Sequence, residues 1–109
     1  MKELVEFFKQ RGLLFRSLEP LEPKTFEIKK RVELFRGLDT QNSFVLVVQM
    51  AKKSRLLQKE VQELEKMSKK IEAKLDHGFK RRFLLIQGPI CSKAKEELEK
   101  MGWRIHALV

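Results

Sequence analysis

The sequence predicts an α/β fold in which a mixed β-sheet is covered by helices on both faces, with elements in the order α-β-β-β-α-β-α-β. Two observations predict this class. Several short segments either alternate apolar and polar residues or run apolar throughout, which is typical of strands. Between the last of these segments, apolar residues recur every three to four positions, which is typical of helices that connect parallel strands by right-handed crossovers.

Length and composition predict one cytoplasmic domain over residues 1–109. The 42% apolar content and the few glycines and prolines exclude disordered and collagen-like classes. One cysteine, Cys91, excludes an internal disulfide and fits a reducing compartment. The longest apolar run, over residues 44–48, is far shorter than the roughly 20 residues that span a membrane, and the acidic N-terminus does not suit a signal peptide.

Charge points to a polyanionic partner. Lysine and arginine number 24 against 15 acidic residues, and the formal net charge is +9. Most of the excess lies in residues 51–109, which hold 15 basic and 8 acidic side chains. Such a balance favours DNA or RNA over a membrane surface, because contacts with phosphates release counterions and long-range attraction steers association.

The first elements are a helix, a short strand and an interruption. Leu4, Phe7 and Phe8 form an apolar stripe that predicts a helix over residues 2–11, which Gly12 ends. Residues 13–15 predict a short strand. Prolines follow at positions 20 and 23, and because proline removes a backbone donor, they predict a loop or an unpaired edge.

A β-hairpin is expected next. Apolar and polar residues alternate over residues 25–35, which predicts a strand with one solvated face. Residues 37–42 have the composition of a turn, with Asp39 and Asn42 suited to local backbone hydrogen bonds. Residues 43–50 are apolar on both faces and predict a central, doubly covered strand.

The second half predicts helix, strand, helix and strand. The longest helix covers residues 54–76, with Ser54 as N-cap. A buried strand over 83–87, a helix over 93–101 and a last strand over 103–109 follow. One side of the long helix is mostly apolar, and this seam either packs onto the chain's own sheet or forms a coiled coil. The seam consists of Leu57, Val61, Leu64, Ser68, Ile71 and Leu75.

This order of elements resembles the αβββαβ core of the PD-(D/E)xK nuclease superfamily, which includes restriction endonucleases, Holliday junction resolvases and RecB-like domains. The likeness spans about residues 1–109 and is better in the second half, over residues 80–90 and 92–105. It implies a restriction-endonuclease-like core. In that superfamily an acid on the second core strand, and an acid and a lysine two residues apart on the third, hold Mg²⁺ and position the attacking water.

The resemblance places this chemistry on three residues of the chain. Glu33 falls at the first acid, and Gln49 and Ala51 stand where the second acid and the lysine belong, with Lys52 one residue further on. It therefore implies Glu33, Gln49 and Lys52 as catalytic candidates and Glu33 as ligand of Mg²⁺. Because glutamine brings no charge and alanine no chemistry, we expect a degenerate site that is inactive or weak. Alternatively, Glu33 is a solvated charge and Gln49 bonds a neighbouring backbone group.

The candidate nucleic-acid contacts are two basic groups on either side of the long helix. The lysines of that helix either join them in a phosphate-binding stripe or form a solvated face with the interspersed glutamates. Trp103 either stacks on a base or belongs to the core. The basic candidates are Lys52, Lys53, Arg55, Lys80, Arg81 and Arg82.

Three functions follow from these observations. The first is a nucleic-acid-binding protein with a nuclease-like fold and a degenerate metal site. The second is a metal-dependent nuclease with a migrated site, for which Mg²⁺- or Mn²⁺-dependent cleavage would vanish in Glu33→Ala. The third is a protein–protein interaction module, which dimerises or docks through the helix at 54–76 or through the last strand.

Overall fold

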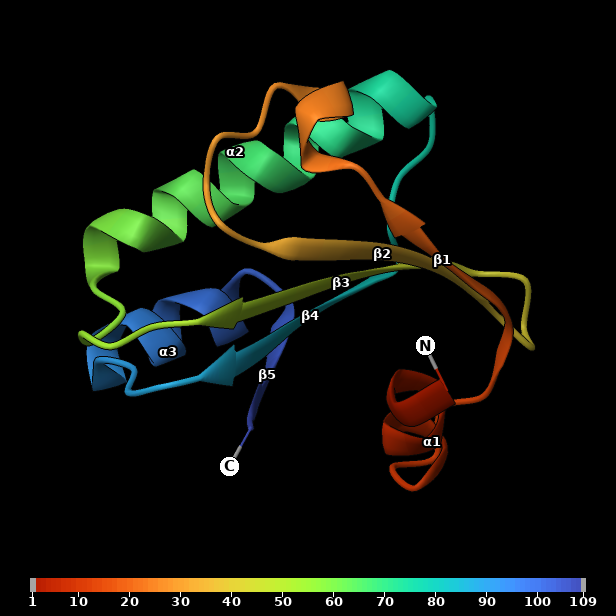
Figure 1. Ribbon diagram of the computed structural model, residues 1–109, viewed down its shortest axis with the longest axis horizontal. Coiled ribbons are helices and arrows are strands. Elements are labelled where there is room, and N and C mark those ends of the chain that lie inside the picture. The colour runs from red at the N-terminus through yellow and green to blue at the C-terminus, as the bar shows by residue number, and fades with distance from the viewer. Residues whose placement is uncertain (1, 109) are drawn as a thin grey trace.

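The structure is a computed structural model that describes residues 2–108, and it contains one five-stranded sheet (Figure 1). The strands lie in the order β1-β2-β3-β4-β5, the first three antiparallel and the last three parallel. The α/β class with a mixed sheet is confirmed. The elements are α1 (Lys2–Lys9), β1 (Phe15–Leu21), a 3-10 helix (Pro23–Phe26), β2 (Glu33–Asp39), β3 (Phe44–Ala51), α2 (Gln58–Leu75), β4 (Arg81–Gln87), α3 (Ser92–Lys100) and β5 (Trp103–Ala107).

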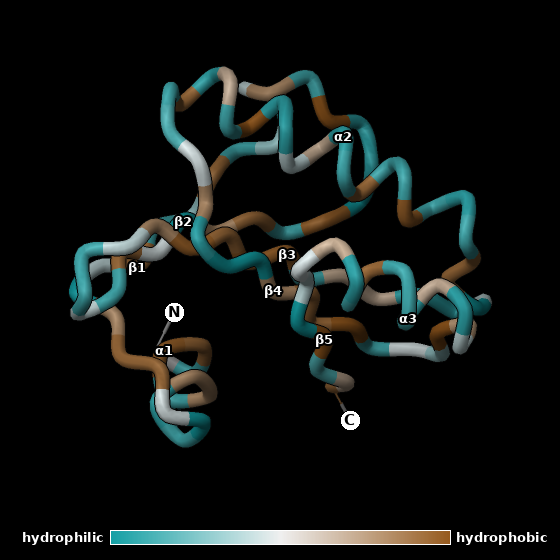
Figure 2. Tube along the Cα trace, turned by 180° about the vertical axis from the view of Figure 1, so that it is seen from behind, coloured by the Kyte–Doolittle hydropathy of each residue, from teal (hydrophilic) through white to brown (hydrophobic). Residues whose placement is uncertain are grey.

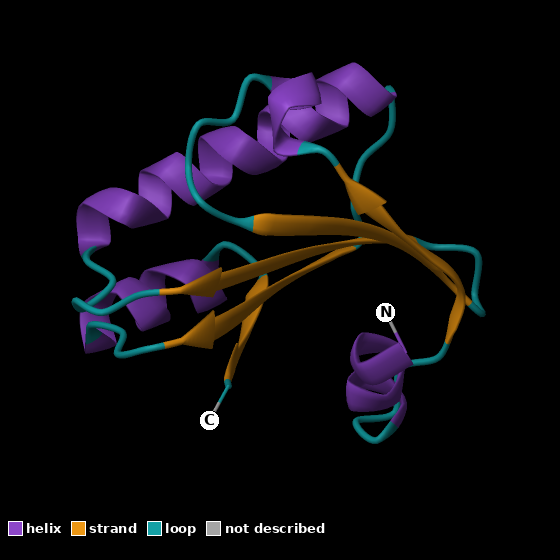
Figure 3. Ribbon diagram, viewed as in Figure 1, coloured by secondary structure: helices purple, strands orange, loops and turns teal. Residues whose placement is uncertain are grey.

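Helices lie on both faces of the sheet, with α1 and α2 on opposite sides (Figure 3). On the α1 side, Phe8 packs with side chains of β3 and β4, among them Val47 and Phe83. On the other side, Leu46 and Val48 pack with residues of α2 and α3. Both faces of β3 are therefore buried over residues 45–48, which explains the apolar run over residues 44–48. In Figure 2 the hydrophobic colour runs through the middle of the sheet, while α2 alternates along its turns.

The predicted strand over residues 25–35 is wrong in its first part, because β2 begins only at Glu33. Pro23 starts a 3-10 helix instead, and Glu27 adopts a left-handed conformation with φ 57°. Phe26 and Ile28 are nevertheless buried in the core on the α2 side. Their spacing of two thus reflects two side chains that enter the same core from a non-extended backbone.

The prolines and Gly37 also differ from expectation. Strand β1 continues through Pro20, which pairs with Phe35; β1 lies at the edge of the sheet, where a missing donor is tolerated. Gly37 lies within β2 rather than in the turn, and a Cβ there would collide with the ring of Phe15. The turn begins after Asp39, whose carboxylate accepts hydrogen bonds from the amides of residues 41 and 43, as its predicted role requires.

Helix α2 begins at Gln58, four residues later than predicted, and Ser54 is not its N-cap. Leu56 lies just before α2, is buried, and forms an isolated bridge with Ile90, which follows β4. Most of the apolar seam packs onto the chain's own sheet, although Leu57 is 45% exposed.

The last elements differ from expectation mainly at their ends. Helix α3 begins at Ser92, one residue earlier than predicted, and β4 begins at Arg81, two residues earlier. The last strand ends at Ala107, and position 109 of the predicted strand lies outside the described residues. Within residues 2–108, no helix combines the length and apolar composition needed to cross a bilayer.

Candidate functional site

Glu33 and Gln49 lie opposite one another on neighbouring strands. They are direct partners in the antiparallel register of β2 and β3. Side chains alternate between the faces of a strand, so Gln49 shares the α1 side of the sheet with Val45 and Val47. Glu33 is exposed and Gln49 is half-buried. The structure therefore brings together two of the three catalytic candidates.

Two adjoining pockets surround this pair. The first has a volume of about 320 Å³, and its lining also includes Ala51 and Gln87, which are partners in the parallel register of β3 and β4. The second, of about 270 Å³, adds Glu3 from α1. Gln87 could have been found from the sequence, because it directly follows an apolar run, as Gln49 does. Glu3 carries no such signal, since its place depends on how α1 docks.

The residues present do not fit the Mg²⁺ site that the resemblance implies. Magnesium prefers oxygen ligands that include carboxylates. Glu33 faces a neutral amide at Gln49, and Ala51 offers no ligand. Across the described part of the chain, no three His, Cys, Asp or Glu side chains are grouped so that they could hold a metal ion.

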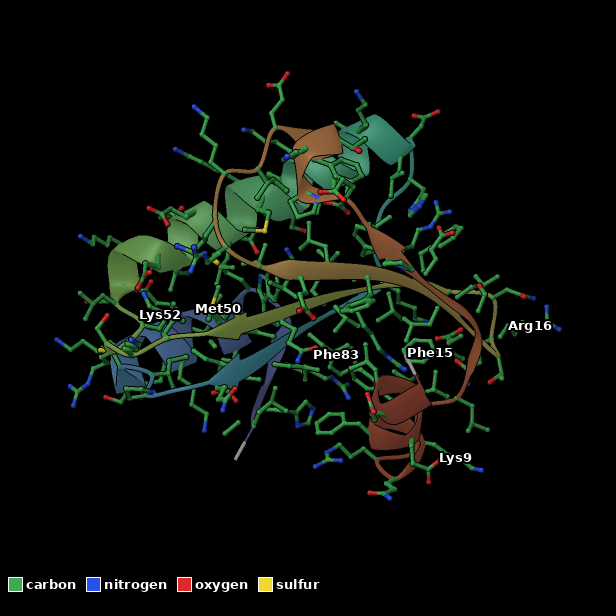
Figure 4. The ribbon with its side chains drawn as sticks, in the orientation of Figure 1. Lys9, Phe15, Arg16, Met50, Lys52 and Phe83 are labelled. Carbon is green, nitrogen blue, oxygen red and sulfur yellow. The ribbon has the colours of Figure 1, made fainter. Side chains whose placement is uncertain are left out.

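Lys52 takes part in an ion pair on the α2 side. Its Nζ donates to the carboxylate of Glu60, which also accepts hydrogen bonds from Lys30 at 3.3 Å and from the Leu57 amide at 2.9 Å. Burial by itself would raise the pKa of Glu60, but the hydrogen bonds from Lys52, from the Leu57 amide and from Lys30 outweigh it and lower the pKa to about 2. In Figure 4, Lys52 lies just beyond the end of β3, far from Phe83 and Phe15, which lie on the α1 side of the sheet.

The close approach of two backbones fixes Lys52. Its amide donates to the carbonyl of Gln87 at 2.8 Å, and a Cβ at Gly88 would collide with its carbonyl oxygen. Gly88 has φ 136°, which disfavours any residue with a side chain. Lys52 therefore leaves β3 in a set position beside the end of β4, and its ammonium group points to the start of α2.

The two predicted basic groups lie at opposite ends of the parallel pair β3 and β4. Lys53 and Arg55 are exposed after the end of β3, and Lys80 and Arg81 precede or begin β4. In the register of these strands, Arg81 lies opposite Val45. At about 3.3 Å per residue, some 20 Å of strand separates the groups.

Arg82 is held in the structure by a second ion pair. Its guanidinium donates to Glu65 of α2 at 2.6 Å and to the carbonyl of Met101. The same Glu65 oxygen accepts the indole N–H of Trp103 at 2.6 Å. Trp103 is 2% exposed and belongs to the core, so its ring does not offer a face for base stacking.

Comparison with known proteins shows the fold. No protein-family model and no curated protein matches this sequence. The structure of EndoMS in apo form superposes with a TM-score of 0.59 over 98% of this chain, at 22% identity. An EndoMS–dsDNA2 complex gives 0.54 over 99% at 20% identity, and a repair endonuclease from Pyrococcus abyssi gives 0.53 over 85% at 18% identity. The match covers 45%, 42% and 39% of those chains, so this chain spans less than half of their length.

Proposed function

We propose that this chain is a nucleic-acid-binding domain with a nuclease-like fold and a degenerate site that does not cleave efficiently. DNA is the favoured ligand, since one of the structures that share its fold is an EndoMS–dsDNA2 complex, matched over 99% of this chain. The net charge of +9 supports a polyanionic ligand independently of that likeness. Binding is expected to rest on phosphate contacts and to weaken as salt rises.

The proposal that the site does not cleave efficiently is supported by the pairing of Glu33 with Gln49 beside Ala51. Two charged groups that the resemblance requires are missing from this pocket. Lys52, the nearest lysine in the sequence, is paired with Glu60. Phosphodiester cleavage needs charge at the metal and at the attacking water, and the strand residues Glu33, Gln49 and Ala51 supply only one carboxylate between them.

Fluorescence anisotropy tests the binding. Labelled double- and single-stranded DNA and RNA are titrated with the protein at salt concentrations from about 50 to 300 mM. We expect the logarithm of the affinity for DNA to fall linearly with the logarithm of the salt concentration, with a slope of several units. Weak signals for all four ligands, without salt dependence, would overturn the proposal and favour a protein–protein interaction module.

A cleavage assay tests the degenerate site. Plasmid DNA is incubated with the protein and Mg²⁺ or Mn²⁺, beside Glu33→Gln and the matched variant Glu22→Gln, which removes the same charge from an exposed residue outside the pocket. We expect no cleavage by any of the three proteins. Metal-dependent cleavage that disappears only in Glu33→Gln would replace this proposal with a nuclease that uses Glu33, Gln49 and Lys52.

A further inference from the structure

Three arginines from separate elements line one pocket on the α1 side of the sheet. Arg11 follows α1, Arg81 begins β4 and Arg104 lies in β5. The pocket has a volume of about 460 Å³. Arg81 and Arg104 face the same side as Phe83, because Arg104 pairs with Phe83 and Arg81 precedes Phe83 by two residues. We call Arg11, Arg81 and Arg104 the arginine pocket.

The charge of the arginine pocket is not balanced by carboxylates. Among residues 2–108, no carboxylate forms an ion pair with Arg11, Arg81 or Arg104. One acidic side chain, Glu99, also lines the pocket. Arg11 and Arg104 are exposed and Arg81 is half-buried, so solvent and ligands have access to them. Guanidinium groups match the geometry of phosphate oxygens and bind them by paired hydrogen bonds.

His106 reports the electrostatic environment of this pocket. Its ring packs against Phe7 and Phe83, with ring centroids 5.6 and 6.0 Å away, and Arg11 lies 3.6 Å above the ring of Phe7. Burial lowers the pKa of His106, and the positive charges of Arg11 and Arg104 lower it further. A bound anion would oppose the effect of these two positive charges on the pKa of His106.

We propose that the arginine pocket binds phosphates of the DNA backbone, on the same face as the Glu33–Gln49 pair. Arg81 lies four residues before Leu85 on β4, and Leu85 pairs with Gln49, so about 13 Å of strand separates the two places. This inference rests on the proposed function and locates its phosphate contacts. It moves them away from Lys52 and Arg82, whose charges are already paired with Glu60 and Glu65.

Binding measurements on single variants test this assignment. Arg11→Gln, Arg81→Gln and Arg104→Gln are compared with Lys66→Gln and Lys69→Gln, which remove the same charge from exposed positions of α2. For a labelled DNA duplex we expect each arginine variant to lose about tenfold in affinity and about one unit of salt slope. We expect less than about twofold loss for the lysine variants. Urea unfolding of each variant checks that it is folded.

The outcomes separate this inference from the proposed function. If the wild-type protein binds no DNA, the proposed function fails and the pocket assignment fails with it. If the wild type binds DNA with a salt slope, but the lysine variants lose affinity and the arginine variants do not, the function stands and the arginine pocket is wrong.

The two histidines provide a second readout by NMR. His106 lies in the arginine pocket, whereas His77 lies after α2 and stacks on Phe44. On addition of a DNA duplex, we expect the ring signals of His106 to shift and its pKa to rise. The ring signals of His77 should not shift on the same addition. In Arg104→Gln the response of His106 should be much smaller. A response of His77 alone would overturn the assignment.

Discussion

The two faces of the sheet use their cations differently, and Arg81 and Arg82 show this most directly. The two residues are neighbours on β4, so they face opposite sides. Arg82 turns toward α2 and is bound by Glu65, with its side chain 19% exposed. Arg81 turns toward α1 and lines a pocket with two further arginines. The same residue type therefore contributes to folding on one face and is available to a ligand on the other.

The difference follows from what covers each face. Helix α2 brings glutamates to the edge of its buried side, and Glu60 and Glu65 meet the cations that point toward them. Helix α1 is short and meets the sheet mainly through apolar side chains such as Phe8. Cations on that side thus find few carboxylates, and their charge remains open to solvent or to a polyanion.

The largest expected effect compares Arg82→Gln with Arg81→Gln. Removing Arg82 leaves the largely buried carboxylate of Glu65 with the indole of Trp103 as its remaining donor. We expect the free energy of unfolding to fall by about 3 kcal/mol for Arg82→Gln and by less than about 0.5 kcal/mol for Arg81→Gln. Urea denaturation, followed by the fluorescence of the buried Trp103, measures both. Equal losses in the two variants would remove the distinction between the faces.

The second prediction concerns acid. Glu60 has a pKa of about 2 in the folded protein against 4.5 as its ordinary value, so the folded state favours the charged form. Its contribution, about 3 kcal/mol, is present above pH 4.5 and is lost as the pH falls from 4.5 toward 2. Urea unfolding of the wild type and Glu60→Gln across this range measures it.

Glu60→Gln should unfold at similar urea concentrations at both ends of this range, apart from the contributions of other acids. Glu96→Gln, at an exposed position of α3, serves as the matched control and should keep the pH dependence of the wild type. An unchanged pH profile in Glu60→Gln would show that its network with Lys52 and Lys30 does not stabilise the fold.

The third prediction concerns Ser68, on the buried side of α2. Its side chain is 0% exposed, and its hydroxyl has no hydrogen-bond partner among the described residues. Ser68→Ala removes this unpaired group and improves helix propensity, so we expect the free energy of unfolding to rise by about 1 kcal/mol. Ser54→Ala is the control, because Ser54 does not cap α2, and it should change stability little. A stability loss in Ser68→Ala would contradict this account.

The smallest expected effect is on the α1 side, in Gln49→Glu. A second carboxylate directly opposite Glu33 should lower the free energy of unfolding by about 0.5 kcal/mol through like-charge repulsion. Millimolar Mg²⁺ should restore it, because two carboxylates then share one cation. Thermal unfolding with and without Mg²⁺ measures this. Gln41→Glu is the control, because it adds the same charge in the exposed β2–β3 turn and should show no response to Mg²⁺. If Mg²⁺ stabilises Gln41→Glu as much as Gln49→Glu, the cation does not bind specifically between residues 33 and 49.

The expectations about burial were met more fully than those about backbone. Residues 45–48 are 0% exposed, as their apolar character on both faces indicates. Phe26 and Ile28 are buried as their alternation suggests, but not in a strand. Hydrophobic pattern reports which side chains leave water, whereas the backbone path also depends on Pro23 and on the left-handed Glu27.

The candidate site, too, is predicted by the sequence in some respects and decided by the tertiary structure in others. The sequence alone shows Gln49 and Ala51 at the two positions where the resemblance predicts an acid and a lysine. It also predicts the strands that bring Glu33 next to Gln49, since a short turn joins them. It does not show that Lys52 is paired with Glu60, because that contact depends on where α2 begins, which is two residues after the buried and bridged Leu56.

The sequence by itself determined the α/β class, the buried central strand and the surplus of positive charge, because these follow from local pattern and composition. Only the tertiary structure decided which cations are already paired with carboxylates. Arg11, Arg81 and Arg104 come from three elements that are distant in the chain, and docking of α1 against β4 and β5 brings them to one pocket. Charge neutralisation depends on distances of a few ångströms between side chains, and packing sets those distances.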